Sequence, residues 1–500
     1  MSSLKERLGR LKKTADTAVD SASTAVLVSE TLGASWERLG AKMHHNDWGQ
    51  FIIRRLRYPF DHMHGKYRLG ELCGEAGPLS ALGAVAKKRG SRKGSGRGRN
   101  GSFAAENQTA DPLALPPVSH ERLLFLDTET TGLGVGAGNV AFMVGIGFYD
   151  PDAFVVEQLF IRNPAEEAAM LHHLRERLTD RDMLVSYNGK CFDWPVLKNR
   201  YILNRQKDGA TDPVHFDFLY PSRSLWRNTL PSCRLSSVER ERLGLSRIDD
   251  VPGSLAPALY FQYLAENDPT LVAGVFEHNE KDVLTLACLA IHLTRLMTGT
   301  VPRERMEPEE LFRLALWLDK LGRAEEADEV FRELLGLESE QAADYLLPAA
   351  EFYKGQGRFG PAISLWERAI ERKRRSRIAP LTPYVELAMY YEHQQKDYDR
   401  ALLYAEQAFE KARGRISAAR KEGSGAEELE AIRKRVERLK AKRDSARKRK
   451  DMRKPVAGAA NKGGKRYGSE WTAGIWQQTL TFSGEDIRSG ERSERRTETL

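Results

Sequence analysis

Residues 120–298 alternate between the hydrophobic spacing of strands and that of helices. Three apolar runs come first, at residues 122–127, 140–150 and 154–162, and each is short with few polar interruptions. Runs of this kind are typical of buried strands. Because the joints between the three runs are short, we predict that they form an antiparallel meander.

The positions after the meander predict a mixed succession of helices and strands. Residues 165–178 and 194–204 have helical spacing, and residues 183–188 and 215–220 are typical of short strands. A long helix is predicted from about residue 271 to 297, and the remainder is also expected to be helical. The stretch is therefore predicted to be one α/β domain, in which helices flank a mixed sheet.

Residues 307–413 repeat a helix–turn–helix unit. Gly322 returns 35 residues later as Gly357, and Ala327 returns as Ala362 at the same offset. A third, slightly longer unit follows. A period near 34 residues, with small residues at fixed positions, is the signature of tetratricopeptide repeats. We predict an all-α tetratricopeptide-like repeat domain here, with an irregular helical bundle as the alternative.

The remaining segments are predicted to contribute little to a core. Residues 1–86 are expected to form a helical segment and then a small packed lead-in, whose four histidines fit no standard metal-site spacing. Residues 87–119 are predicted to be a flexible linker, because they contain a basic stretch rich in Gly and Ser. Residues 414–500 are predicted to form a basic helix followed by a disordered tail.

The charge of the chain is concentrated in one segment. The 500 residues carry a formal net charge of +8. Residues 411–454 alone hold 18 Lys or Arg against 7 Asp or Glu, a net +11, which leaves about −3 for the rest. A basic segment of this kind suits contact with a polyanion, and a solvated helical tail is an equal alternative.

The cysteines and the apolar runs indicate the compartment. The four cysteines are far apart in sequence and form no CxxC pair, which predicts neither a zinc site nor a disulfide framework and fits a reducing compartment. The N-terminal sequence lacks the pattern of a signal peptide, and no run of 18 apolar residues exists. We therefore expect a cytoplasmic protein that does not associate with a membrane.

Acidic residues in three separate segments carry the candidate chemistry. Asp127 and Glu129 are two apart on a predicted strand, so their side chains share a face. His278 and Asp282 are four apart on a predicted helix and also share a face. Asp193 begins a predicted helix, a position that alone would indicate a helix cap. Carboxylates are preferred ligands of Mg²⁺ or Mn²⁺, and two such ions can clamp a phosphodiester displacement.

Three motifs in order resemble the DEDD superfamily of exonucleases, which have a ribonuclease H-like fold. They are DTETTGL at residues 127–133, NGKCFD at 188–193 and HNEKD at 278–282. The third motif has a histidine at the spacing of the subclass that uses tyrosine. This combination resembles the YprB-type ribonuclease H-like domain, and the resemblance covers about residues 120–298.

The resemblance implies a role for each matching residue. Asp127, Glu129, Asp193 and Asp282 would hold two divalent cations, Mg²⁺ or Mn²⁺. His278 would orient or deprotonate the attacking water, because the ordinary pKa of histidine lies near neutrality. The implied activity is 3′→5′ exonuclease hydrolysis of nucleic acid.

The candidate contacts to the nucleic-acid substrate are Thr128, Asn188, Arg223 and Trp226. Asn188 either contacts the end of the nucleic acid or only shapes its turn. Arg223 and Trp226 follow the predicted strand at 215–220 and are candidates to contact phosphate or bases. An exposed helix start is the alternative interpretation for that pair.

Two functions of different classes compete. The first is a metal-dependent nuclease acting on DNA or RNA. The second is an adaptor, in which a ribonuclease H-like module binds nucleic acid and the repeats recruit a protein partner. A pure scaffold is disfavoured, because a scaffold does not need four converging acids.

Overall fold

The structure is a computed structural model that describes residues 33–83 and 118–452. Within these ranges it leaves out residues 133, 135, 137, 207–208, 210, 248–249, 375–378 and 419–424. The predicted N-terminal helical segment before residue 33, the basic linker at 87–117 and the predicted disordered tail after residue 452 lie outside the described residues.

A mixed sheet of seven strands forms the centre of the first domain, as the sequence predicts. The strand order is β1-β2-β7-β6-β5-β8-β9. The β5–β8 and β8–β9 pairs are parallel, and the other four pairs are antiparallel. The strands are β1 (Ala41–Asn46), β2 (Gly49–Pro59), β5 (Leu123–Thr130), β6 (Ala141–Tyr149), β7 (Ala153–Phe160), β8 (Met183–Ser186) and β9 (Val214–Asp217), and a separate two-stranded ribbon pairs β3 (Met63–His64) with β4 (Tyr67–Arg68).

Strands β1 and β2 belong to the main sheet, although sequence analysis predicted only a packed lead-in for this part of the chain. Strand β2 pairs with β7 and extends the predicted meander. The arginines of β2 obscure the strand pattern, because their partners come from distant segments. Arg54 pairs with Glu280 (2.7 Å), and Arg57 pairs with Asp150 (2.9 Å).

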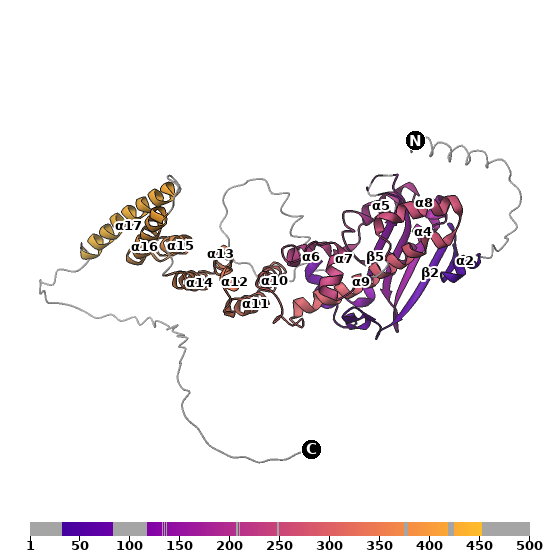
Figure 1. Ribbon diagram of the computed structural model, residues 1–500, viewed down its shortest axis with the longest axis horizontal. Coiled ribbons are helices and arrows are strands. Elements are labelled where there is room, and N and C mark those ends of the chain that lie inside the picture. The colour runs from indigo at the N-terminus through magenta and orange to yellow at the C-terminus, as the bar shows by residue number, and fades with distance from the viewer. Residues whose placement is uncertain are drawn as a thin grey trace, which may run out of the picture.

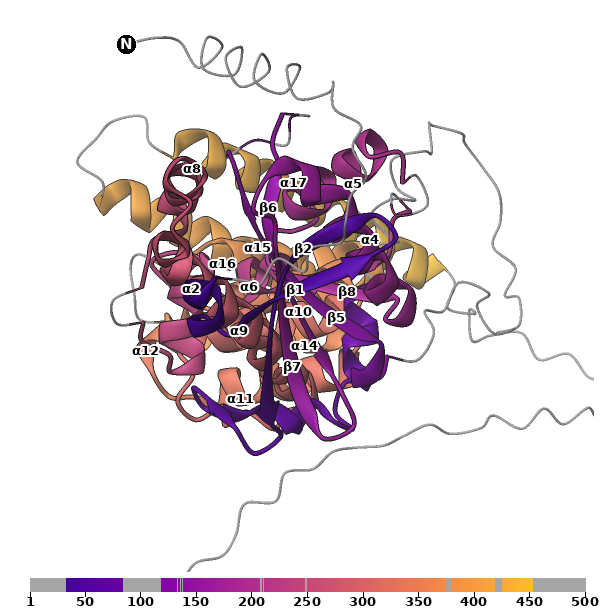
Figure 2. The ribbon, with the colours of Figure 1, turned by 90° about the vertical axis from the view of Figure 1, so that its right-hand side faces the viewer.

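Helices cover both faces of the sheet (Figure 2). Leu124 and Leu126 of β5 pack in one hydrophobic cluster with α4 and α5, whereas Leu123 and Phe125 pack in another cluster with α9. Helix α8 packs beside β6, where the rings of Tyr260 and Phe142 stack 4.2 Å apart. The helices of this domain are α2 (Ala34–Arg38), α4 (Glu167–Asp180), α5 (Asp193–Leu203), α6 (Leu219–Trp226), α7 (Leu235–Val238), α8 (Ala256–Glu266) and α9 (Ala273–Thr298).

The strand predicted at residues 215–220 is shorter than expected. It ends at Asp217, and α6 begins at Leu219. The carboxylate of Asp217 accepts the backbone N–H of Leu219 (3.0 Å), which favours the helical turn over a continued strand. Trp226, predicted to lie near the start of a helix, is therefore at the end of one.

The second region is all-α and extends away from the sheet (Figure 1). The repeated residues Ala327 and Ala362 are buried, and Gly322 and Gly357 have positive φ at the turns of their units. The repeating pattern therefore marks real helix pairs, while the tetratricopeptide class stays a prediction. The helices are α10 (Pro308–Lys320), α11 (Ala324–Gly336), α12 (Glu340–Ala343), α13 (Leu346–Gly355), α14 (Phe359–Arg372), α15 (Thr382–Tyr390), α16 (Tyr398–Ala418) and α17 (Ala426–Met452).

The two regions meet where α6 contacts α10. The indole N–H of Trp226 donates to Glu310 (3.0 Å), and Arg242 forms an ion pair with the same carboxylate (3.2 Å). Trp226 is fully buried and Glu310 is nearly so. A buried, hydrogen-bonded contact of this kind fixes the first helix of the repeat region against the sheet domain.

Candidate active site

Strand β5 carries the first two acids of the candidate site. Asp127 and Glu129 project toward α9, where the side-chain amide of Asn279 donates to a carboxylate oxygen of Asp127 (2.9 Å). Asn279 is fully buried and fits because Gly145 on β6 has no side chain. A Cβ at Gly145 would lie 2.1 Å from Oδ1 of Asn279. The β5–β6 register shifts directly after Glu129, a β-bulge of the kind often found beside active sites.

Asp193 reaches the site from the first turn of α5. The hydroxyl of Thr128 donates to Oδ1 of Asp193, so the two motifs are joined directly. The preceding turn needs Asn188 at a positive φ of 68°. Asp217 holds this turn in place, because its carboxylate accepts the backbone N–H of Asn188 (2.8 Å) and of Lys190 (3.1 Å).

Helix α9 contributes His278 and Asp282. The Nε2 atom of His278 lies 3.6 Å from a carboxylate oxygen of Asp282. Its Nδ1 atom lies 2.8 Å from Asp250, a carboxylate that fixes the orientation of the ring. Gly253 leaves room for the imidazole, since a Cβ there would lie 3.2 Å from Nε2.

Arg247 joins the acids of α9 to the rest of the domain. Its guanidinium donates to Asp282, to Asp250 (2.9 Å) and to Glu239 (2.9 Å). The side chain of Glu239 is almost fully buried, and it begins a π-helical turn at residues 239–243. One cation therefore lies among three carboxylates, beside His278.

The electrostatics of the four acids favour a bound cation. Burial, together with the charges of Asp282 and Glu129, holds the pKa of Asp127 well above its usual range. Burial and the charge of Asp282 raise the pKa of Glu129 to about 8. Burial raises the pKa of Asp193 to about 6, against the hydrogen bond from Thr128. Grouped carboxylates that resist ionisation are stabilised by a divalent ion.

The present side-chain positions are nevertheless those of a closed cluster. Among the described residues, no three His, Cys, Asp or Glu side chains are placed to share one metal ion as they stand. Asp127, Asp193 and Asp282 are each engaged by a protein donor instead. The donor chemistry fits Mg²⁺ or Mn²⁺, and Arg247 is the group that must yield at Asp282.

The predicted substrate contacts are placed differently from one another. Thr128 is buried and bonded to Asp193, and Asn188 is exposed in its turn. Arg223 is exposed on α6, where its charge acts on Tyr187 and Cys233. Trp226 is fully buried against α10, so its position does not suit contact with a substrate.

Sequence reasoning missed Asn279, Arg247 and Asp250. Asn279 lies within the third motif, directly after His278, but its role depends on the glycine opposite it on β6. Arg247 and Asp250 lie outside all three motifs. No spacing rule links them to α9, because their contacts arise only through the tertiary fold.

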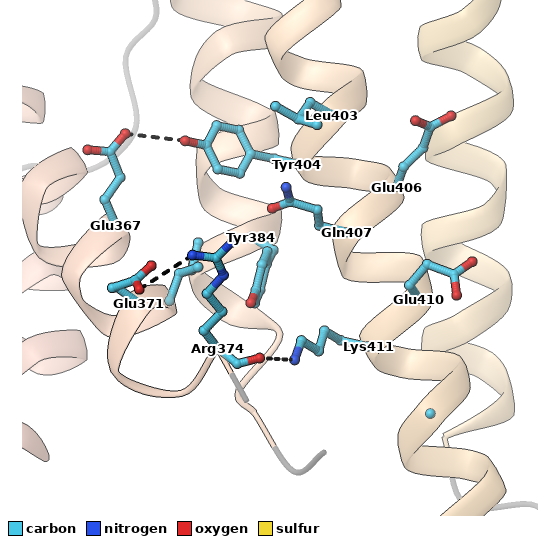
Figure 3. A pocket seen from close by; sticks show the side chains of 12 residues that line it. Glu367, Glu371, Arg374, Tyr384, Leu403, Tyr404, Glu406, Gln407, Glu410 and Lys411 are labelled. Atoms are coloured by element: carbon cyan, nitrogen blue, oxygen red, sulfur yellow. Dashed lines mark hydrogen bonds and ion pairs between the residues drawn. The ribbon is translucent and has the colours of Figure 1, made fainter. Parts of the chain in front are cut away.

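A hollow of about 800 Å³ lies in the helical region, between α14, α15 and α16 (Figure 3). None of the candidate site residues lines it. Its glutamates already have partners: Tyr404 donates to Glu367 (3.2 Å), and Arg374 pairs with Glu371 (3.6 Å). Its size therefore does not make it the centre of the chemistry.

Comparisons with known proteins agree with the sheet domain. The profile of the RNase H superfamily matches residues 124–294, a stretch that includes all five candidate catalytic residues. The uncharacterized protein YprB of Bacillus subtilis (strain 168) is 32% identical over 383 residues, which cover 75% of this chain and 84% of that protein. The mixed sheet flanked by helices is thus a ribonuclease H-like fold, followed by an all-α region.

A similarity to a solved structure is weaker. The family B DNA polymerase from the hyperthermophilic archaeon Pyrobaculum calidifontis is 16% identical, with a TM-score of 0.28. The match covers 41% of this chain and 30% of the polymerase chain. A TM-score this low supports no argument about fold or function. Within the described residues, no helix has the length and apolar character needed to cross a membrane.

Proposed function

The chain belongs to the YprB family, and we propose that it is a metal-dependent nuclease that hydrolyses phosphodiester bonds of nucleic acid as a 3′→5′ exonuclease. Its match to the RNase H superfamily indicates a nuclease. The observation that carries the finer proposal is the convergence of Asp127, Glu129, Asp193 and Asp282 from β5, α5 and α9 beside His278.

Each carboxylate has a defined part in the proposal. Asp127, Glu129, Asp193 and Asp282 hold two divalent cations through hard oxygen ligands. When bound, such ions supply positive charge that stabilises the charge developing on the phosphate and on the leaving oxygen. Thr128 orients Asp193 through its hydroxyl, and Asn279 orients Asp127 through its amide.

His278 accepts the proton of the attacking water. The 2.8 Å contact of its Nδ1 atom with Asp250 favours the tautomer in which Nδ1 carries the hydrogen. The lone pair is then on Nε2, which lies beside Asp282. A base held in one tautomer by a carboxylate is a recurring arrangement in hydrolases.

The test uses the full chain with 5′- and 3′-end-labelled single-stranded DNA and RNA, in Mn²⁺, in Mg²⁺ and in EDTA. Release of single nucleotides from the 3′ end in either metal, and none in EDTA, is the expected result. Asp127→Asn removes one ligand charge and should abolish the release. Asp47→Asn is the matched control, because Asp47 is exposed in the β1–β2 turn. Equal activity of Asp127→Asn and wild type would refute the proposal.

A second candidate function is favoured by the ion pair between Arg247 and Asp282. A guanidinium that stays on Asp282 would exclude a cation there and leave an adaptor that binds nucleic acid without cutting it. Wild-type protein that binds the labelled oligonucleotides in both metals and leaves them intact would support this second candidate.

A further inference from the structure

A second cavity lies behind the turn that leads to Asp193, where the sheet domain meets the first helix of the repeat region. Its volume is about 250 Å³. Lys190 and His215 line it from the sheet domain, and Trp317 and Lys320 line it from α10. The cavity is therefore built from two regions that are far apart in the sequence, and it includes none of the four carboxylates of the candidate active site.

One wall of this interdomain cavity carries cationic and hydrogen-bonding groups. Lys190 is partly buried, and within the described part of the chain its ammonium has no hydrogen bond or salt bridge. Burial lowers the pKa of His215 to about 3, so the ring is neutral. One ring nitrogen of His215 contacts the hydroxyl of Ser186 (2.7 Å), which leaves the other nitrogen available to a ligand. Lys320 adds a second ammonium.

The cavity also holds one carboxylate, which weakens the positive field only in part. Asp217 lines it, but the backbone N–H groups of Asn188, Lys190 and Leu219 already donate to its oxygens. Burial raises the pKa of Asp217 despite these donors. The two lysines therefore leave a net positive charge within the cavity.

The opposite wall is apolar and aromatic. Trp317 presents an indole edge from α10, and Leu82 and Leu321 are beside it. A flat aromatic group is held well against such a surface, while an ammonium group binds a phosphate as a point charge. The volume suits a ligand the size of one nucleotide and excludes a folded partner.

We propose that this interdomain cavity is a binding site for a nucleoside monophosphate, with its phosphate on Lys190 and Lys320 and its base against Trp317. The choice of a nucleotide rests on the proposed nuclease function, since such a molecule is the product of exonuclease hydrolysis. The same chemistry is present in the phosphorylated end of a nucleic-acid chain, so the source is either a free mononucleotide or a terminal nucleotide.

Occupancy of this cavity reaches the catalytic turn through Asp217. The carboxylate of Asp217 holds the backbone N–H of both Asn188 and Lys190, and the latter residue also lines the cavity. A phosphate that draws on Lys190 therefore acts on the turn that positions Asp193. The binding site is thereby connected to one carboxylate of the proposed active site without overlapping it.

The test is calorimetric titration of the full chain with AMP and with dAMP in EDTA. Wild type should bind one nucleotide per chain. Lys190→Gln and Lys320→Gln should each weaken binding roughly tenfold or more, because each removes a charged hydrogen bond. Lys198→Gln is the matched control, since Lys198 is a helix lysine paired with the exposed Asp212. Melting temperatures within about 2 °C of wild type confirm that the variants fold.

Further arms separate the possible sources and the possible failures. Inorganic phosphate, AMP and a 5′-phosphorylated oligonucleotide are compared in the same titration, and tighter binding of the oligonucleotide identifies the chain end as the ligand. Asp127→Asn, which should lack nuclease activity, must bind AMP as wild type does. No AMP binding at millimolar concentration, or equal binding by the two cavity variants, overturns the inference. A wild type that cuts nucleic acid but fails to bind AMP refutes the cavity site alone. One that binds AMP but cuts nothing refutes the nuclease alone.

Discussion

The side-chain amide of Asn279 on α9 donates to the carboxylate of Asp127 on β5 at 2.9 Å. The oxygen of the same amide accepts a hydrogen bond from Gln158 on β7 (3.0 Å). One fully buried asparagine therefore ties the long helix to two strands of the sheet and fixes the first acid of the candidate site.

Replacing this asparagine should cost both stability and activity. Asn279→Ala leaves Gln158 without one acceptor and Asp127 without its neutral donor, so the free energy of unfolding should fall by about 1–3 kcal/mol. Urea denaturation of wild type and variant measures the loss. Asn228→Ala is the control, because Asn228 is exposed and bonds only to Glu309. A loss no larger than that of the control would contradict the proposed role of Asn279.

Gly145 should not tolerate even a methyl group. A Cβ at this position would lie 2.1 Å from Asn279 Oδ1, and the asparagine cannot move away because it is fully buried. Gly145→Ala should therefore lower the free energy of unfolding by roughly 1–3 kcal/mol. At Gly360 on α14 a Cβ meets nothing within 4 Å, so Gly360→Ala should be neutral or slightly stabilising. Equal thermal midpoints for the two variants would show that the packing at Gly145 is loose.

Arg247 should be important for stability and should also compete with cations. Arg247→Met leaves Glu239 buried without its cation, and the free energy of unfolding should fall by about 3 kcal/mol. Adding Glu239→Gln should restore part of that loss. Because Asp282 is then free of the guanidinium, Mg²⁺ should raise the melting temperature of Arg247→Met by more than it raises that of wild type. An equal rise would mean that Arg247 does not stand in the way of a metal ion.

Stability at acidic pH should depend on Glu157. Burial alone would raise the pKa of Glu157, but His173 and Arg177 lower it to about 2. Since the unfolded pKa is about 4.5, the stabilisation is complete above that pH and is lost as the pH falls toward 2. Wild type should therefore lose stability between pH 4.5 and 2 more steeply than Glu157→Gln does. Parallel unfolding curves for the two proteins across this range would contradict the assignment.

The centre of the fold could be predicted because its pattern is local. Strands β5, β6 and β7 are buried along nearly their whole length, so their sequences are almost continuously apolar. The β1–β2 hairpin could not be predicted in the same way. Its consecutive arginines are neutralised by Glu157, Glu280 and Asp150, and no sequence rule links those partners to β2.

The candidate site shows the same division. Asp127, Glu129, His278 and Asp282 follow the spacing of a strand and of a helix, so their shared faces can be read from the sequence. Trp226 cannot be read in this way, because a tryptophan after a strand looks the same whether it contacts a substrate or packs against another helix. Only the position of α10 places it in the core.

The pairing of β2 with β7 sets a lower limit on any recombinant fragment. Cutting the chain to its superfamily match at residues 124–294 would remove the hairpin and turn β7 into an edge strand, with the backbone of eight paired positions exposed. The edge would be long and apolar, which is a template for pairing between copies. Such a fragment should aggregate on expression, whereas one that begins before Ala34 keeps its edge covered. The minimal soluble form of this nuclease fold is therefore longer than its family match.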